Sequence, residues 1–144
     1  MGEITLSFVI RDWSAWAPGL DGRDAWRAWA KGEADIPKAD GAPDVRDLPV
    51  GLRRRLSRLG KMALRVAMDV DPGFSPRIIF SSRNGNVTQM LGLLESLARD
   101  EPLSPTAFGM SVHNSLAGML SIISGNRESH TAIAAGGGSW GGEV

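Results

Sequence analysis

A glycine cluster near the end of the chain is the stretch whose residue types and spacing most directly suggest chemistry. Residues 136–141 read GGGSWG, which matches the pattern G-x-G-x-x-G, and a short apolar run precedes them. Glycines at a strand-to-helix turn let a phosphate approach the backbone N–H groups of the helix N-terminus. Two features of a dinucleotide site are missing, because the apolar run is the third expected strand rather than the first, and Val144 comes before the acidic residue expected about 20 positions on. Binding of a small molecule or nucleotide by the Gly136–Gly141 loop is therefore an alternative hypothesis.

The chain offers few other groups for acid, base or nucleophilic chemistry. His113 and His130 are its only histidines, and it contains no cysteine. This composition excludes disulfides, thiolate metal sites and a cysteine nucleophile within the sequence. No Walker, G-x-S-x-G or H-E-x-x-H pattern is present. We interpret His113, at the start of an expected helix, as a cap or a satisfied polar contact, and we expect no metal and no cofactor.

The densest charged feature is a run of basic side chains on one expected helix, which begins at Pro49 and extends to about Met68. The basic residues are Arg53, Arg54, Arg55, Arg58, Lys61 and Arg65. One interpretation is a solvated helix face whose long side-chain stems cover apolar neighbours. The other is a docking surface for an acidic partner. Nucleic acid is not expected as a partner, since 16 basic and 16 acidic residues balance and no DNA-binding motif is present.

Hydrophobic periodicity predicts the elements that hold these residues in place. Strands are expected at Ile4–Ile10, Arg77–Ser82 and Thr131–Ala135, and a loop at Ile36–Pro49. The long basic helix should bury a stripe of Leu52, Leu56, Leu59, Ala63 and Val66. A helix capped by Asn86 should turn Met90, Leu91, Leu94 and Leu97 inward. Leu116, Met119, Leu120 and Ile123 indicate a buried helix that Ser124-Gly125-Asn126 terminates.

Four tryptophans crowd the region before the first long loop. A short helix from Arg23 to Lys31 places Ala25, Trp26 and Trp29 near one face, and Gly32 ends it. We interpret this group, which also includes Trp13 and Trp16, as packing of the core and of a lid. A base-stacking platform would need interleaved basic residues, which this region lacks.

Bulk properties describe an ordinary globular domain. With 144 residues and 42% hydrophobic composition, the chain can bury a sizeable core without a metal or disulfide. The alternation of strands and helices predicts a layered α/β fold with a mostly parallel sheet. Arg11 and Asp12 interrupt the first apolar stretch, so a signal peptide is not expected. No stretch has the roughly 20 apolar residues of a membrane span, so we expect a cytoplasmic protein.

Three motifs in the second half of the chain resemble the β-ketoacyl synthase family. They are Ser104-Pro105-Thr106, Ser111-Val112-His113-Asn114 followed by small residues, and the run from Thr131 to Gly136, TAIAAG. The segment Trp26–Gly32 followed by Ile36, and the turn Ser81–Gly85, are similar to further family segments. Within the family, the chain resembles the short chain length factor, or ketosynthase-like, N-terminal branch. The resemblance covers most of the chain and is weakest over Ile36–Leu48.

The resemblance implies an α/β thiolase-like (ketosynthase) fold and specific positions for its functional parts. Residues 1–144 would be the ketosynthase-like N-terminal domain, an incomplete N-terminal half that is truncated at its C-terminal end. The family's nucleophilic cysteine would fall at Gly136 or Gly137, so no catalytic residue is expected. The strand at the centre of the family's dimer would be Ser129, His130, Thr131, Ala132, Ile133, Ala134 and Ala135. An acyl carrier protein, which is acidic, would dock on Arg53, Arg54, Arg55 and Arg58.

The function that this resemblance implies is a non-catalytic chain length factor that pairs with an active ketosynthase subunit. Such a heterodimer would serve fatty-acid, polyketide or aryl polyene type biosynthesis. A thiolate is the nucleophile suited to acyl transfer, and without one this subunit is not expected to condense acyl groups alone. Besides the glycine-loop alternative, a third hypothesis is a truncated gene product with no independent function.

Overall fold

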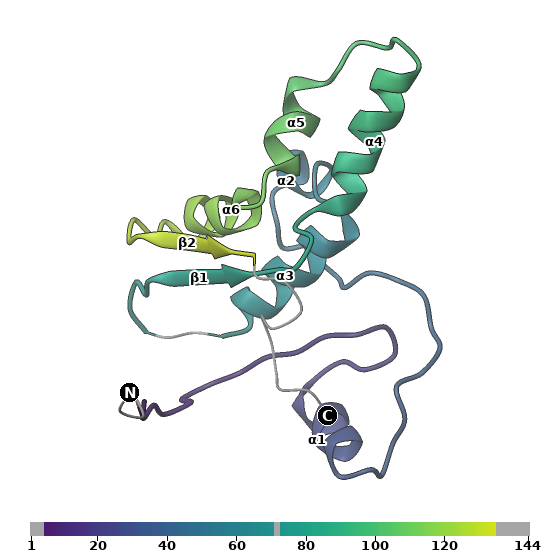
Figure 1. The fold of residues 1–144 in the computed structure, drawn as a ribbon. Coiled ribbons are helices and arrows are strands. Elements are labelled where there is room, and N and C mark those ends of the chain that lie inside the picture. Colours follow the sequence, from purple (N-terminus) through teal and green to yellow (C-terminus); the bar gives the residue numbers. More distant parts are fainter. Residues whose placement is uncertain (1–4, 71–72, 135–144) are drawn as a thin grey trace.

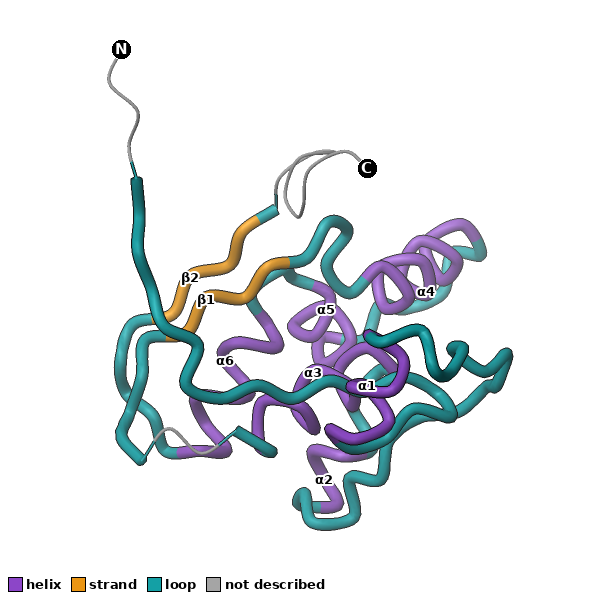
Figure 2. Tube along the Cα trace, turned by 90° about the horizontal axis from the view of Figure 1, so that it is seen from below, coloured by secondary structure: helices purple, strands orange, loops and turns teal. Residues whose placement is uncertain are grey.

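The computed structural model describes residues 5–70 and 73–134, and within them the chain forms helices around a small sheet (Figures 1 and 2). In chain order the elements are α1 (Arg23–Ala30), α2 (Val50–Arg53), α3 (Arg58–Met68), β1 (Ile78–Ser81), α4 (Val87–Ala98), α5 (Pro105–Ser111), α6 (Ser115–Ser124) and β2 (His130–Ile133). In the part of the chain that the structure describes, no helix has the length and apolar character needed to cross a membrane.

Helix α6 is the element on which the others pack. It contacts α3, α5 and both strands, and Leu116 and Ala117 on its inner face are 3% and 2% exposed. The helix ends at Gly125, whose φ of 66° is the left-handed conformation that glycine adopts without a Cβ penalty. The expected buried helix and its glycine stop are therefore confirmed.

The hydrophobic core joins α6 to α3 and to the loop before α2. Leu64 on α3 is the most buried large side chain, at 1% exposure. Its cluster consists of Val45, Leu48, Leu56, Leu64, Met110 and Leu116, with Leu52, Leu59, Ala63, Met68, Phe80, Met119, Leu120 and Ile123 packed around it. Most of the apolar stripe predicted for the basic helix thus lies in the core, although Val66 is not part of this cluster.

The two strands form a parallel pair, with Ile78 opposite His130 and Ser81 opposite Ile133. Asn126 fixes the entry to this pair. Its side chain is almost fully buried, with its Nδ2 donating to the Pro76 carbonyl at 2.7 Å and its Oδ1 accepting from Glu128 N–H at 2.9 Å. One satisfied amide therefore ties the segment before β1 to the segment before β2. The parallel arrangement predicted from the sequence is confirmed.

The first expected strand is wrong over the described part of its range. Residues 5–10 are not a strand, and Leu6, Phe8, Val9 and Ile10 are 82%, 82%, 84% and 71% exposed. A strand requires a hydrogen-bonding neighbour, and in the described residues the only sheet contains β1 and β2. The β-forming residues gave this segment a propensity for strand structure, but that propensity does not show whether a second strand lies beside it.

The tryptophans were predicted to pack in the core, and this is only partly correct. Helix α1 forms as expected and contains no buried residue. Trp26 and Trp29 pack edge to face at 5.4 Å, while Trp29 remains 43% exposed. Arg23 lies over the Trp13 ring at 5.7 Å. The group is a satellite cluster around α1 rather than part of the main core, and Figure 1 shows α1 well separated from α4 and α5.

The single helix predicted from Pro49 to Met68 is two helices. Residues 54–57 separate α2 from α3, and the Ser57 side chain caps α3 by accepting from Gly60 N–H at 3.1 Å. Serine is favoured at a helix N-cap because its short hydroxyl can accept a hydrogen bond from the unpaired N–H groups of a helix start. The break places Leu56 in the core and separates Arg53 from Arg58.

Helix α4 does not turn its leucines inward as predicted. Met90, Leu91, Leu94 and Leu97 are 47%, 53%, 53% and 58% exposed. The strand before it is also less buried than expected, since Ile79 is 70% exposed. Among the described elements α4 packs mainly against α5. Apolar residues surround most of this helix, so periodicity could not choose its buried face.

Candidate functional site

The carboxyl end of β1 leads into a turn, residues 82–86, that connects the sheet to the α4–α5 helix pair. Ser82 N–H donates to the Ile133 carbonyl at 3.1 Å. The carbonyl of Ser82 accepts from His113 Nε2 at 2.8 Å. One residue therefore joins the end of β2 to the segment between α5 and α6. In parallel sheets, this edge is where functional loops gather.

The His113 side chain contacts this turn, so of the two interpretations made from the sequence, a cap or a satisfied polar contact, the structure shows the polar contact. The carbonyl of Ser82 can only accept, so Nε2 carries the proton and, in the neutral ring, Nδ1 does not. The ring lies edge-on to Phe80, with centroids 6.0 Å apart. A Cβ at Gly85 would lie 3.0 Å from the His113 ring, and Gly85 has a φ of 57°. The close approach of the ring and the backbone conformation both favour glycine at this position.

Asn86 holds the start of α4 against the end of α5. The residue is 3% exposed, and its Nδ2 donates to the Met110 carbonyl at 3.0 Å. It precedes α4 as the predicted N-cap, but its side chain makes no capping hydrogen bond. The sequence therefore identified the position correctly and the contact wrongly. Instead of satisfying its own helix, the amide connects two helices.

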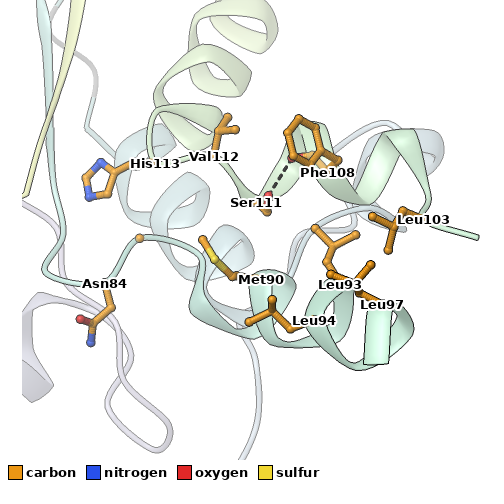
Figure 3. A pocket seen from close by; sticks show the side chains of 11 residues that line it. Asn84, Met90, Leu93, Leu94, Leu97, Leu103, Phe108, Ser111, Val112 and His113 are labelled. Atoms are coloured by element: carbon orange, nitrogen blue, oxygen red, sulfur yellow. Dashed lines mark hydrogen bonds between the residues drawn. The ribbon is translucent and has the colours of Figure 1, made fainter. Parts of the chain in front are cut away.

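An open apolar groove lies between α4 and α5 beside this turn, with a volume of about 360 Å³. Figure 3 shows it extending from His113 and Asn84 at one end to Leu103 at the other. The remaining lining residues are Gly85, Met90, Leu93, Leu94, Leu97, Phe108, Ser111 and Val112. None of these carries a formal charge at neutral pH. The groove, which we call the α4–α5 groove, is suited to apolar contact rather than to proton transfer.

The sequence did not predict this groove. Two signals for it were present, namely the nearly continuous apolar character of α4 and the apolar residues Leu103, Phe108 and Val112 around α5. Neither signal showed that the two helices would leave their shared face open. That outcome depends on where α5 ends and α6 begins in the segment after Ser104.

The described residues contain no group of three or more histidine, aspartate, glutamate or cysteine side chains that could hold a metal ion. The glycine loop 136–141, and with it Gly136 and Gly137, lies outside the described residues, as does Ala135. Its nucleotide-binding alternative therefore stays a hypothesis. The other residues of the predicted dimer strand lie on or beside β2, namely Ser129, His130, Thr131, Ala132, Ile133 and Ala134.

The two edges of β2 are chemically distinct. The carbonyls of Ser129 and Ile133 accept from Ile78 N–H and Ser82 N–H, so the odd-numbered residues direct their backbone groups to β1. Because alternate residues of a strand present N–H and C=O to opposite sides, those of His130 and Ala132 face the other edge. No strand among the described elements pairs with that edge. It is therefore available to a further strand.

The four arginines predicted to dock a carrier protein do not lie on one helix. Arg53 ends α2 and donates to the Arg46 carbonyl at 3.3 Å. Arg58 begins α3 and pairs with Asp40 at 3.2 Å. Arg54 and Arg55 lie in the intervening turn, are exposed, and form no ion pair with any described residue. Of these four arginines only Arg58 forms an ion pair within the described chain, and Arg54 and Arg55 are the two exposed arginines that have no ion pair to lose.

The groups with clear pKa shifts lie away from the groove. Hydrogen bonds from the Arg46 side chain and backbone lower the pKa of Asp44 to about 2. A hydrogen bond to Asp69 raises the pKa of Arg65, which also contacts Asp47 at 3.1 Å. Because the Asp44 pKa is lowered from 3.8, its pair with Arg46 stabilises the fold above that pH and is lost as pH falls through about 2. The contact between Arg65 and Asp47 joins the loop before α2 to α3.

Comparison with known sequences identifies the family to which this fold belongs. Residues 26–141 match the sequence model of the beta-ketoacyl synthase N-terminal domain. The chain is a member of the β-ketoacyl synthase family. The match covers the second part of α1, both strands, the groove and the glycine loop. The resemblance inferred from the SPT, SVHN and TAIAAG motifs is confirmed.

A solved structure supports the same membership of the β-ketoacyl synthase family. It is the ketosynthase ApeO in complex with its chain length factor ApeC, from Xenorhabdus doucetiae, and one chain of it matches at 34% identity with a TM-score of 0.75. The match covers 92% of this chain and 56% of that chain, so this chain spans about half the length of its structural relative. No curated protein matches the sequence. The expected thiolase-like ketosynthase fold is confirmed for this partial N-terminal half.

Proposed function

We propose that this chain is a non-catalytic ketosynthase-like subunit, a chain length factor, that pairs with an active ketosynthase. One observation carries the proposal: a domain of the β-ketoacyl synthase family has no cysteine anywhere in its 144 residues. The family's acyl-transfer chemistry needs a thiolate. At the position where the resemblance places the family's nucleophilic cysteine, this sequence has a glycine, Gly136 or Gly137.

Two further observations support pairing with a ketosynthase. The similar solved chain belongs to a complex of a ketosynthase with its chain length factor. In addition, β2 presents an edge that no described strand occupies. Peptide N–H and C=O groups on such an edge form hydrogen bonds when a second strand is added. We infer that residues Ser129–Ala135 are the contact strand.

Reconstitution of condensing activity tests this function. The chain alone, mixed with malonyl-loaded and acyl-loaded carrier protein, should give no product above the rate without enzyme. Adding an active ketosynthase subunit that binds the chain should give turnover, and replacing that ketosynthase's nucleophilic cysteine by alanine should abolish it. Mass spectrometry of the carrier-bound product is the measurement. Turnover by the chain alone would contradict the proposal.

The arginines between α2 and α3 are the surface that we propose for the acyl carrier protein. Exposed arginines attract an acidic partner and raise its association rate, an effect that salt screens over about 10 Å. Arg54 and Arg55 are the residues to test, because reversing their charge breaks no ion pair of the described chain.

Replacing Arg54 and Arg55 together by glutamate should raise the Kd for the carrier protein about tenfold at low salt. The difference from wild type should shrink as salt is added. Surface plasmon resonance across a salt series gives both quantities. The matched control is the double replacement of Arg83 and Arg127, two exposed arginines elsewhere, by glutamate. Equal weakening by both double variants would assign the effect to net charge and remove the proposed surface.

A further inference from the structure

Each polar group of Ser82 makes a hydrogen bond where the sheet meets the helices. Its N–H donates to the Ile133 carbonyl at 3.1 Å, and its carbonyl accepts from His113 Nε2 at 2.8 Å. Its Oγ accepts from Gly85 N–H at 3.0 Å. The bond to Ile133 lies on the β1-facing edge of β2, so it uses none of the groups on the open edge. It holds the carboxyl end of β2 in register with β1.

The backbone that carries His113 is itself held in place. The carbonyl of Met110 accepts from Asn86 Nδ2 and from Ser115 Oγ, each at 3.0 Å. These two bonds tie the end of α5 to the starts of α4 and α6, and His113 lies between α5 and α6. A side chain that extends from a fixed backbone can hold a neighbouring group in one position.

The His113 ring has little freedom to leave the Ser82 carbonyl. Phe80 lies against it edge to face, with the ring centroids 6.0 Å apart. Gly85 lies close enough that a Cβ there would be 3.0 Å from the ring. Nε2 is a donor both in the charged ring and in the neutral tautomer that this contact selects, so the bond does not require one charge state.

We infer that His113 is a positioning residue for β2, the strand proposed to contact the ketosynthase. The inference rests on the proposed function, because it concerns the same contact strand. A partner strand bonds to an edge only where the N–H and C=O groups keep the spacing of a regular strand. Since β2 contains four residues, a shift at its carboxyl end displaces a large part of that edge. His113 thus acts on the contact through Ser82 and β2.

The test compares His113→Met with His113→Gln, since the two side chains have nearly the same length and both lack the ring. Only glutamine carries an N–H group that can replace Nε2 as donor to the Ser82 carbonyl. Exchange of the Ser82 amide hydrogen, followed by NMR, reports the bond to Ile133 directly. This exchange should be about fivefold faster in His113→Met, the factor that an average hydrogen bond contributes, and within about twofold of wild type in His113→Gln.

Binding to the ketosynthase, measured by biolayer interferometry, is the second readout. His113→Met should raise the Kd about fivefold, and His113→Gln should leave it within about twofold of wild type. The matched control is Ser57→Ala, which removes a hydrogen bond at the start of α3 and none that involves the sheet. This variant should lower the thermal stability of the chain without changing the Kd. Circular dichroism of all three variants should show the wild-type helix content.

The outcomes separate this inference from the proposed function. Faster exchange and weaker binding in His113→Met, both restored in His113→Gln, would support it. Unchanged Ser82 exchange in His113→Met would overturn it whether or not a partner binds, and so would faster exchange with a wild-type Kd. An equal rise of the Kd in Ser57→Ala would assign the effect to lost stability and also overturn it. If wild type does not bind the ketosynthase, the proposed function fails, and Ser82 exchange still decides whether His113 holds β2.

Discussion

Replacing Ala132 by proline should abolish co-purification of this chain with its ketosynthase while leaving the chain folded. The N–H of Ala132 faces the open edge of β2, whereas Ile133 and Ser129 face β1. Proline removes that donor and places its ring where a pairing strand would approach, but it leaves the hydrogen bonds to β1 in place. Edge positions tolerate proline for this reason. Affinity-tag co-purification of the co-expressed pair is the measurement.

The control for this prediction is Ala132→Ser, which keeps the N–H and nearly the same volume, and which should co-purify like wild type. Ile133→Pro is a less specific variant, because it acts on the side of β2 that bonds to β1 and should lower the stability of the chain itself. Thermal unfolding separates the two effects. If Ala132→Pro is folded and co-purifies as well as Ala132→Ser, the β2 edge is not where the partner binds.

Short-range sequence signals were sufficient for the elements that carry their own stabilising interactions. Helix α6 was predictable because its apolar residues recur at helical spacing and Gly125 has the conformation that ends a helix. Strand β2 was predictable to within two residues at each end because a small apolar run followed a turn. Its parallel pairing with β1 followed from the intervening helices, which the crossover between parallel strands requires.

Other features depended on interactions with neighbouring residues and elements, which hydrophobic periodicity does not describe. The basic helix read as continuous because no proline or glycine interrupts Leu52 to Leu59, yet Ser57 caps a new helix there. Residues 5–10 have strand propensity, but no described strand pairs with them. The open face of α4 could not be predicted because its apolar residues are distributed around the helix.

The candidate site was predicted in parts. The motifs led to the right family and to the position of β2, since both depend on local residue identity, whereas the role of β2 as a contact strand stays a prediction. The link from Ser82 to His113, and the groove beside it, bring together residues from β1, α4, α5 and the start of α6. Such a surface depends on packing between elements distant in sequence, and packing is determined by side-chain volumes rather than by periodicity.

Replacing Leu64 by alanine should lower the free energy of unfolding by about 2–5 kcal/mol, the range found for buried leucines. Leu64 is 1% exposed, and the helices around it cannot easily close the cavity. A Cβ on Gly60 would already lie 3.0 Å from Leu56 Cδ2 and 3.2 Å from Leu116 Cδ2, so α3 and α6 are in close contact. We therefore expect a value in the upper half of that range, a large share of the roughly 5–15 kcal/mol typical of a domain.

Urea unfolding followed by circular dichroism measures this free energy of unfolding. The control is Leu91→Ala, at a 53% exposed position, which should lie within about 0.5 kcal/mol of wild type. A loss below about 1 kcal/mol for Leu64→Ala would mean that the α3–α6 contact is not the core of the fold.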